Sequence, residues 1–306
     1  MVLLQAQTST GIIVGVIRDP SGALVPNAQV AVTNQGTNTS FRYTTSGTGD
    51  YYVPSLIPGR YRVEVEKPGF KKVTVADVLV EVDRTSRVDI SLEVGQVTEA
   101  VQVSAPPTQV QTDTTTLGQV IGSRQVSELP LNGRDFTNLL FLNTGVGQMQ
   151  GGIITGIRKH GLNDNFRTGS VNGARPASIS FVVDGVSMND SLFQGISVVP
   201  PIDALEEFKL QNGLYSADFG MGAAQVNIAL KSGTNSFHGS LWEFLRNNAL
   251  QPAQPFFHTK TPLKQNQFGG TLGGPAWIPG IYKGKDRTFF FFSYEAGRRR
   301  SGAISQ

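Results

Sequence analysis

Cysteine is absent from the 306 residues of this chain, so disulfides and thiolate chemistry contribute nothing to its fold or activity. Charged residues make up only 16% of the sequence, and the formal net charge is +3. The one basic run, Arg298-Arg299-Arg300, is too short for a nucleic-acid partner, which requires a clustered basic face. No run of about 18 apolar residues is present, which excludes a transmembrane helix and leaves a membrane β-barrel open.

Signatures of catalysis are also missing from the sequence. The three histidines, His160, His238 and His258, have no second ligand at the spacing of a metal site. The stretch GIYKGKDRT has one residue too few for a phosphate-binding loop, and no Gly-x-Ser-x-Gly elbow occurs. We therefore expect a protein that is not an enzyme and that binds neither a metal nor a cofactor.

The N-terminal part of the chain has the pattern of a β-sandwich. The 35 glycines and 16 prolines indicate many turns between short strands. In GRYRVEVEKPGF the apolar residues Tyr61, Val63 and Val65 alternate with charged residues, as expected for a strand with one buried face. Several such strands with turns between them predict an antiparallel sandwich.

The middle of the chain mixes element types, as in a small α+β domain. Residues 104–116 are rich in Pro, Thr and Gln and predict a linker. Residues 201–212 predict a helix opened by Pro201 that passes into a short strand, and Asp184-Gly185 predicts a turn. The acidic residues near Pro201 suit the N-terminus of that helix: they are Asp203, Glu206 and Glu207.

Three further strands are expected at 236–246, 265–273 and 287–297. The last, RTFFFFSYEAG, is aromatic on both faces. Aromatic residues on both faces beside polar, Gly-rich neighbours fit a strand with lipid or a membrane interface on one side. A buried strand of a soluble sandwich fits this stretch equally well.

Several motifs together resemble the TonB-dependent outer-membrane receptors, in particular the Oar-like type with an N-terminal carboxypeptidase-regulatory-like domain. They are GVIRDPSGALVPNAQVAVTNQGT with GDYYVPSLIPGRYRVEVEKPGF, then FVVDGVSMND, PIDALEEFKLQNGLYSADFGMGAAQVNIALKSGTNSFHGSLWEFLRN and QFGGTLGGP. The resemblance implies a mainly β chain with a small α+β domain. It implies a transthyretin-like β-sandwich, a plug domain and the first strands of an incomplete transmembrane β-barrel.

The expected domain limits follow from this resemblance. They are 8–96 for the sandwich, of a carbohydrate-binding-like fold, 97–116 for a TonB-box-like segment and linker, 117–235 for the plug, and 236–306 for the start of the barrel. A closed barrel requires more strands than three, so we expect the chain to be the N-terminal part of a longer protein. Trp242 and Phe244 would lie on the barrel wall, with Glu243 turned toward the lumen.

The segment before the plug resembles the TonB box of the family, to which a periplasmic energy-transducing partner binds. A short extended stretch can add as a strand to a partner's sheet edge. The alternative is that the same residues form the last strand of the sandwich or a plain linker. The expected partner-binding residues are Glu99, Ala100, Val101, Gln102, Val103, Ser104 and Ala105.

The resemblance implies a receptor that takes up a large solute, possibly a glycan, across the outer membrane. Its partners would be a TonB-type protein and outer-membrane lipid, and its N-terminal domain would lie in the periplasm. The alternative is a surface or periplasmic adhesion protein whose sandwich binds carbohydrate, with Tyr51, Tyr52 and Tyr61 stacking on sugar rings. A structural motif of the plug is expected at Asp184, Gly185, Glu206, Glu207 and Gly220.

Overall fold

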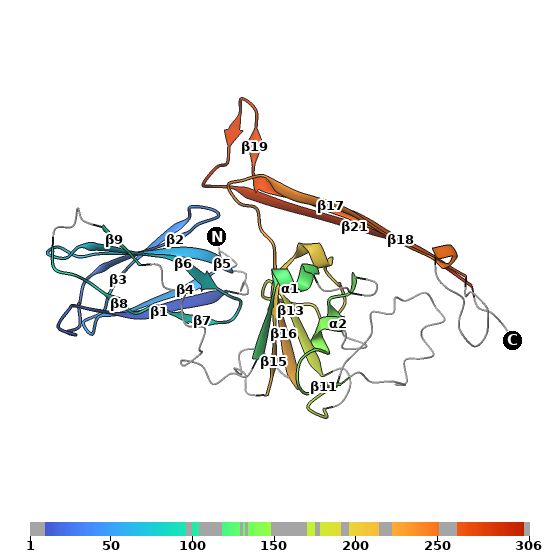
Figure 1. The fold of residues 1–306 in the computed structure, drawn as a ribbon, viewed down its shortest axis with the longest axis horizontal. Helices are drawn as coiled ribbons and strands as arrows, with labels where there is room; N and C mark the ends of the chain where they lie inside the picture. The colour runs from blue at the N-terminus through green and yellow to red at the C-terminus, as the bar shows by residue number, and fades with distance from the viewer. Residues whose placement is uncertain are drawn as a thin grey trace, which may run out of the picture. The chain divides into compact units, whose positions relative to one another are not determined.

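The structure is a computed structural model, and strand is its dominant element (Figure 1). It divides into two compact units, Met1–Lys231 and Ser232–Gln306. The mainly β fold class predicted from the sequence is confirmed. The residues that the structure describes are 10–95, 100–103, 118–128, 131, 134–147, 170–174, 178–190, 196–213, 222–250 and 262–302.

The first sandwich sheet is built around β1, Gly11–Arg18. This strand pairs antiparallel with β4, Asp50–Leu56, and parallel with β7, Thr85–Arg87, and β8, Ile90–Ser91. The second sheet has the order β3-β2-β5-β6-β9. Its strands are β2 Gln29–Asn34, β3 Ser40–Thr44, β5 Gly59–Glu66, β6 Lys72–Val80 and β9 Ala100–Val103.

Alternation along the strands provides the core of the sandwich. On β5, Tyr61, Val63 and Val65 are 1%, 0% and 0% exposed, as predicted. Full burial of each such aliphatic side chain stabilises the fold by about 1.5–3 kcal/mol. The predicted turn at 19–22 is also present: the Asp19 carboxylate accepts hydrogen bonds from the backbone N–H of Ser21 (2.8 Å) and Ala23 (2.9 Å).

The second fold element of this unit is a five-stranded sheet of order β10-β15-β16-β13-β14. Here β13 and β16 run parallel, and the other pairs run antiparallel. The strands are β10 Gly118–Gly122, β13 Ile179–Val183, β14 Val186–Ser187, β15 Leu205–Asn212 and β16 Ala224–Leu230, with a separate pair β11 Val146–Gly147 and β12 Ser170–Val171. The helices are α1 Ser123–Glu128, α2 Thr137–Leu140 and the 3-10 helix η3 Ile202–Ala204.

One face of this sheet is apolar and carries the helices. The rings of Phe136 and Phe208 meet edge to face, 5.5 Å apart at 60°, and Leu139 of α2 belongs to the same buried cluster. The helix predicted to open at Pro201 is limited to the single turn η3, and the strand predicted to follow it is present but longer than expected. LEEFKLQN forms strand β15, because Phe208 and Leu210 alternate with polar residues at period two.

The second unit is a three-stranded antiparallel sheet of order β17-β18-β21. β18, Leu263–Pro275, and β21, Phe289–Ser301, are longer than predicted, whereas β17, His238–Asn247, is one residue shorter than the predicted strand 236–246. The 3-10 helix η5, Asn248–Leu250, follows β17, and β19 Trp277–Ile278 and β20 Tyr282–Lys283 form a small hairpin. Within the described parts of the chain, no helix is both long enough and apolar enough to span a membrane.

Candidate functional site

The predicted partner-binding segment is an edge strand in the structure. Ala100–Val103 form β9, which pairs in parallel with Lys72–Val75 of β6 at one end of the sheet. No strand lies on the other side of β9 among the residues that the structure describes. Glu99, Ser104 and Ala105 lie outside the described residues. These four residues therefore form the last strand of the sandwich, which is the alternative stated above. A TonB-binding role for them stays a prediction.

Asp184 and Gly185 form the tight turn between β13 and β14, as predicted. Both residues have positive φ, 45° and 83°, the backbone geometry of a two-residue hairpin turn. The Asp184 carboxylate also accepts a hydrogen bond from the backbone N–H of Leu230 (3.1 Å), so it joins the turn to the end of β16. Burial raises the pKa of Asp184. Gly220, the last residue of the expected motif, lies outside the described residues.

The second face of the five-stranded sheet is polar and buried. Glu206 and Glu207 lie on strand β15, so the prediction that they belong to a helix N-terminus is wrong. The register places Lys209 opposite Asn227 and Gln211 opposite Gln225. The five polar side chains of this face are each at most 6% exposed: Glu207, Lys209, Gln211, Gln225 and Asn227.

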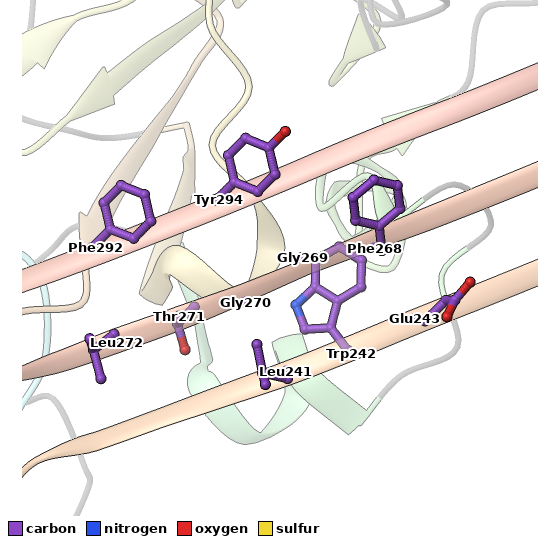
Figure 2. A pocket seen from close by; sticks show the side chains of 10 residues that line it. All are labelled: Leu241, Trp242, Glu243, Phe268, Gly269, Gly270, Thr271, Leu272, Phe292 and Tyr294. Atoms are coloured by element: carbon purple, nitrogen blue, oxygen red, sulfur yellow. The ribbon is translucent and has the colours of Figure 1, made fainter.

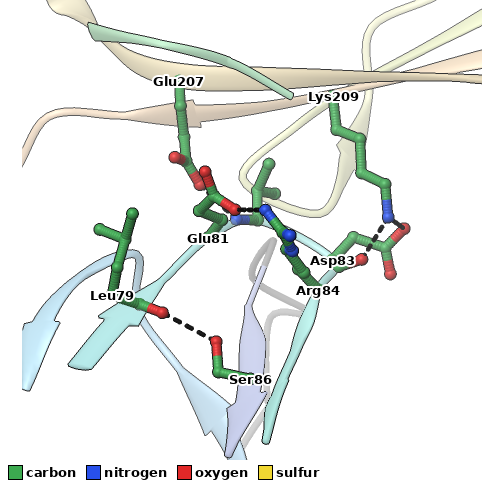
Figure 3. Close-up of polar contacts among 8 residues, drawn as sticks. Leu79, Glu81, Asp83, Arg84, Ser86, Glu207 and Lys209 are labelled. Atoms are coloured by element: carbon green, nitrogen blue, oxygen red, sulfur yellow. Dashed lines mark hydrogen bonds and ion pairs between the residues drawn. The ribbon is translucent and has the colours of Figure 1, made fainter. Parts of the chain in front are cut away.

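The connection between β6 and β7 contacts this polar face (Figure 3). The backbone N–H of Val82 donates to the Glu207 carboxylate. The Lys209 ammonium donates to the Asp83 carbonyl and lies 3.5 Å from the Asp83 carboxylate, to which Gln211 also donates. Asp83 has a positive φ of 50°, a conformation that Asp tolerates better than most residues.

Burial controls the ionisation of these groups. It raises the pKa of Glu207 to about 8, although the hydrogen bond from Val82 favours the carboxylate. It also raises the pKa of Asp83, against the attraction of the Lys209 charge, and it lowers the pKa of Lys209. The contact between the β6–β7 connection and the five-stranded sheet thus contains three ionisable groups, Asp83, Glu207 and Lys209, so its strength depends on pH.

The three-stranded sheet has two chemically different faces. The register places Glu243 opposite Phe268 and Leu241 opposite Gly270, so Glu243 belongs to the more apolar face. Trp242 and Phe244 lie on the other face with the polar side chains of the sheet. The apolar face carries Leu241, Glu243, Leu245, Phe268, Leu272, Phe290, Phe292 and Tyr294. The polar face carries His238, Ser240, Trp242, Phe244, Arg246, Gln265, Gln267, Thr271, Ser293, Glu295 and Arg299, together with Phe289 and Phe291.

The expectation that Glu243 faces a lumen while Trp242 and Phe244 face away from it therefore requires correction. Residues alternate between the two faces along β17 as expected, but this strand alone does not show which face is the more apolar. The neighbours decide it: Leu272, Phe292 and Tyr294 are 50%, 61% and 55% exposed on the side of Glu243 (Figure 2). The face bearing Trp242 is the one suited to water.

Two glycines of β18 allow side chains to lie across the sheet. A Cβ atom on Gly269 would lie 2.5 Å from the indole of Trp242, and one on Gly270 would lie 2.6 Å from Leu241. The Gly-Gly pair in QFGGTLGGP therefore provides the space for Trp242 on one face and Leu241 on the other. The sequence contains this signal, but only the register shows which residues use it.

The tyrosines proposed for glycan stacking are mostly part of the core. Tyr51 and Tyr61 are 4% and 1% exposed, and their hydroxyls donate to the carbonyls of Val88 (2.6 Å) and Ile57 (2.8 Å). Tyr52 is 57% exposed. A sugar platform of three tyrosines is therefore not present on the sandwich.

Comparison with known proteins identifies the two ends of the chain. Residues 12–93 match the family model "Carboxypeptidase regulatory-like domain", and residues 229–306 match "Outer membrane beta barrel domain". The TonB-dependent transporter Oar of Myxococcus xanthus is 28% identical over 309 residues, which cover 94% of this chain and 27% of that protein. The chain is homologous to this transporter over most of its own length. Its homology and its barrel domain assign it to the outer membrane.

The chain spans about 27% of the length of this curated relative, a TonB-dependent transporter. Among solved structures, the siderophore receptor PirA from Acinetobacter baumannii is 21% identical with a TM-score of 0.42, over 61% of this chain and 25% of PirA. Catechol 1,2-dioxygenase from Acinetobacter sp. ADP1 is 14% identical with a TM-score of 0.23, over 33% of this chain and 60% of that enzyme. Similarity at these TM-scores says nothing about function.

Proposed function

We propose that this chain is the N-terminal, plug-bearing part of a TonB-dependent outer-membrane receptor that takes up a large solute. Residues 117–235 would form the plug, residues 236–306 would begin the barrel, and the sandwich at 8–96 would lie in the periplasm. The two-faced sheet β17-β18-β21 is the observation that carries the proposal. One exposed apolar face opposite one polar face is the pattern of a barrel wall between lipid and an aqueous lumen.

The polar face of this sheet would line the lumen. It presents an aromatic pair, Trp242 and Phe244, with ring centroids 5.7 Å apart, among Ser, Thr and Gln side chains. Aromatic rings beside hydrogen-bonding groups suit a solute that is partly apolar and partly polar.

Residues 99–105 would be the segment to which a TonB-type protein binds. Among the residues that the structure describes, no strand pairs with the outer side of β9, so a partner strand could pair with its backbone N–H and C=O groups there. Force applied there would reach the plug through the segment that precedes β10. The parallel pairing of β9 with β6 means that the segment is held on the sandwich until the partner engages it.

Proline substitution tests this assignment. Val101→Pro or Val103→Pro removes a backbone donor and fixes φ, which we expect to abolish binding to a TonB C-terminal domain in a pull-down or calorimetric titration. The sandwich should melt at the temperature of the parent, because β9 is the edge strand of its sheet and pairs with β6 alone among the described strands. Variants that bind as the parent does, or that unfold the sandwich, would show that the segment is only a structural strand.

A further inference from the structure

Residues 81–84, the loop that joins β6 to β7, lie on the polar face of the five-stranded sheet (Figure 3). The Val82 N–H donates to the Glu207 carboxylate, and Asp83 accepts hydrogen bonds from Lys209 and Gln211. Val82 and Lys209 are both buried. The sandwich is thus attached to this sheet by a small set of polar bonds that enclose a buried charge.

The sandwich holds loop 81–84 in a fixed shape. The Asp83 N–H donates to the Thr10 carbonyl (3.1 Å), and the Arg84 carbonyl accepts from the Ile12 N–H (2.9 Å). An ion pair between Glu81 and Arg84 joins the two ends of the loop. Because these bonds all lie within the sandwich, the loop can leave the five-stranded sheet as one piece without loss of the sandwich fold.

The loop satisfies the polar face only in part. The Oε1 atoms of Gln211 and Gln225 are buried and accept no hydrogen bond from any residue that the structure describes. A buried acceptor without a partner destabilises the contact that encloses it, whereas water would supply the missing bonds once the loop has left. Opening of the contact is therefore partly compensated, which favours a contact that forms and breaks over a permanent one.

The loop also links the strand β9 to the beginning of the five-stranded sheet. It continues β6, the strand with which β9 pairs. On β15 it contacts Lys209 and Gln211, whose register partners on β10 are Val120 and Gly118. A displacement of β9 would therefore reach the loop through β6, and the loop contacts the strand that holds β10.

We propose that loop 81–84 is a releasable latch between the sandwich and the five-stranded sheet. In the docked state Asp83 pairs with the buried Lys209 ammonium, and the loop holds β15, and with it β10, in place. In the released state the sandwich moves away as an intact unit and the polar face meets water. A partner that pulls on residues 99–105 would open the latch before it displaces the sheet; this step rests on the proposed function, whereas the latch itself does not.

Hydrogen exchange at the Val82 amide tests the latch, because its bond to Glu207 exists only while the loop is docked. The full chain, purified in neutral detergent, would be followed by mass spectrometry of overlapping peptides from residues 77–87 and 59–66. In the parent, Val82 should exchange more slowly than in an unfolded peptide but faster than the amides of β5, since the latch opens while the sandwich stays folded.

Removal of either partner of the buried pair should release the loop. Asp83→Asn and Lys209→Gln should each speed exchange at Val82 at least about tenfold, as expected from the loss of a hydrogen bond to a charged group. The double variant should exchange no faster than the faster single variant, because the two side chains act as one pair. Exchange in β5 should stay at the parent rate in all three variants.

Asp77→Asn provides the matched control. Asp77 has a positive φ of 58°, close to the 50° of Asp83, so both substitutions place Asn in the same backbone conformation. The Asp77 carboxylate lies 3.8 Å from the Arg60 guanidinium, and both side chains are exposed. Val82 should therefore exchange in this variant as it does in the parent.

Exchange at Val82 as fast as in an unfolded peptide would show that the loop is not docked, and exchange as slow as in β5 would show that it does not open by itself. Equal acceleration in β5 would show that the pair only stabilises the sandwich, and effects that multiply in the double variant would show that Asp83 and Lys209 do not act together. Each of these results would overturn the proposal. TonB binding by residues 99–105 is measured separately, so a failure of the proposed function leaves these measurements unchanged.

Discussion

The indole of Trp242 lies over Gly269, its direct partner on the neighbouring strand. A Cβ atom at position 269 would lie 2.5 Å from the Trp242 ring and 2.3 Å from the Tyr294 carbonyl oxygen. Gly269→Val should therefore displace the indole and separate the strands. We expect it to lower the free energy of unfolding by about 1–3 kcal/mol, the usual cost of overpacking.

Gly297 provides the control for this substitution. A Cβ atom there meets only the Gln267 side chain, at 3.8 Å, so Gly297→Ala should be neutral. Denaturant unfolding followed by tryptophan fluorescence, in a Trp277→Phe background, reports on Trp242 alone. Equal effects of the two glycine substitutions would contradict the packing described for this face.

Tyr51 and Tyr52 give a matched pair in the sandwich. Tyr51→Phe removes the hydroxyl that donates to the buried Val88 carbonyl, whereas the Tyr52 side chain is 57% exposed. We expect Tyr51→Phe to destabilise the isolated 8–96 segment by about 1–2 kcal/mol, because the carbonyl is left without its partner. Tyr52→Phe should change the free energy of unfolding of this segment by less than about 0.5 kcal/mol. Thermal melts followed by circular dichroism measure both, and they also test whether the segment folds alone and cooperatively.

Glu207 should make unfolding depend on pH. Its folded-state pKa of about 8 lies above the ordinary 4.5, so folding takes up a proton between these values. The contribution of Glu207 is fully present below pH 4.5, and the free energy of unfolding falls as pH rises toward 8. The raised pKa of Asp83 acts in the same direction, and the lowered pKa of Lys209 acts in the opposite one.

Glu207→Gln should remove most of this slope between pH 5 and 8, since the amide mimics the protonated acid at every pH. Urea unfolding at several pH values provides the measurement, with Glu206→Gln, the neighbouring residue on β15, as the control. A Glu207→Gln variant whose stability still falls with pH as steeply as in the parent would show that the slope arises elsewhere.

Sequence pattern predicted the sandwich core because alternation is a local signal. Val63 and Val65 are buried because successive side chains of a strand point to opposite faces, and Arg62 and Glu64 take the outer face. Over 201–212, Pro201 and the nearby acidic residues favour a longer helix than the single turn η3 that forms before β15. Phe208 and Leu210 on one face, with Glu207, Lys209 and Gln211 on the other, form a strand because both faces are covered.

Which face of a strand meets lipid is not a local property. Trp242 and Phe244 are the most apolar residues that β17 places on the polar face. When β17 is considered alone, the charge of Glu243 predicts that the face of Glu243 meets water. Only the pairing with Phe268, and beyond it the row of Leu272 with Phe292, shows that Glu243 lies on the apolar face. Likewise, the pairing of Ala100–Val103 with β6 depends on residues 25 or more positions away, which no short window of sequence contains.

Cysteine cross-linking at residue 102 tests the TonB-dependent account most directly. The chain has no cysteine, so Gln102→Cys places a single thiol on β9, and Arg42→Cys places one on β3 at the opposite edge of the same sheet. Each variant would be oxidised with a TonB C-terminal domain that carries one cysteine in its partner-binding strand. The account predicts a disulfide-linked product for residue 102 and none for residue 42. Cross-linking at both edges alike, or at neither, would contradict it.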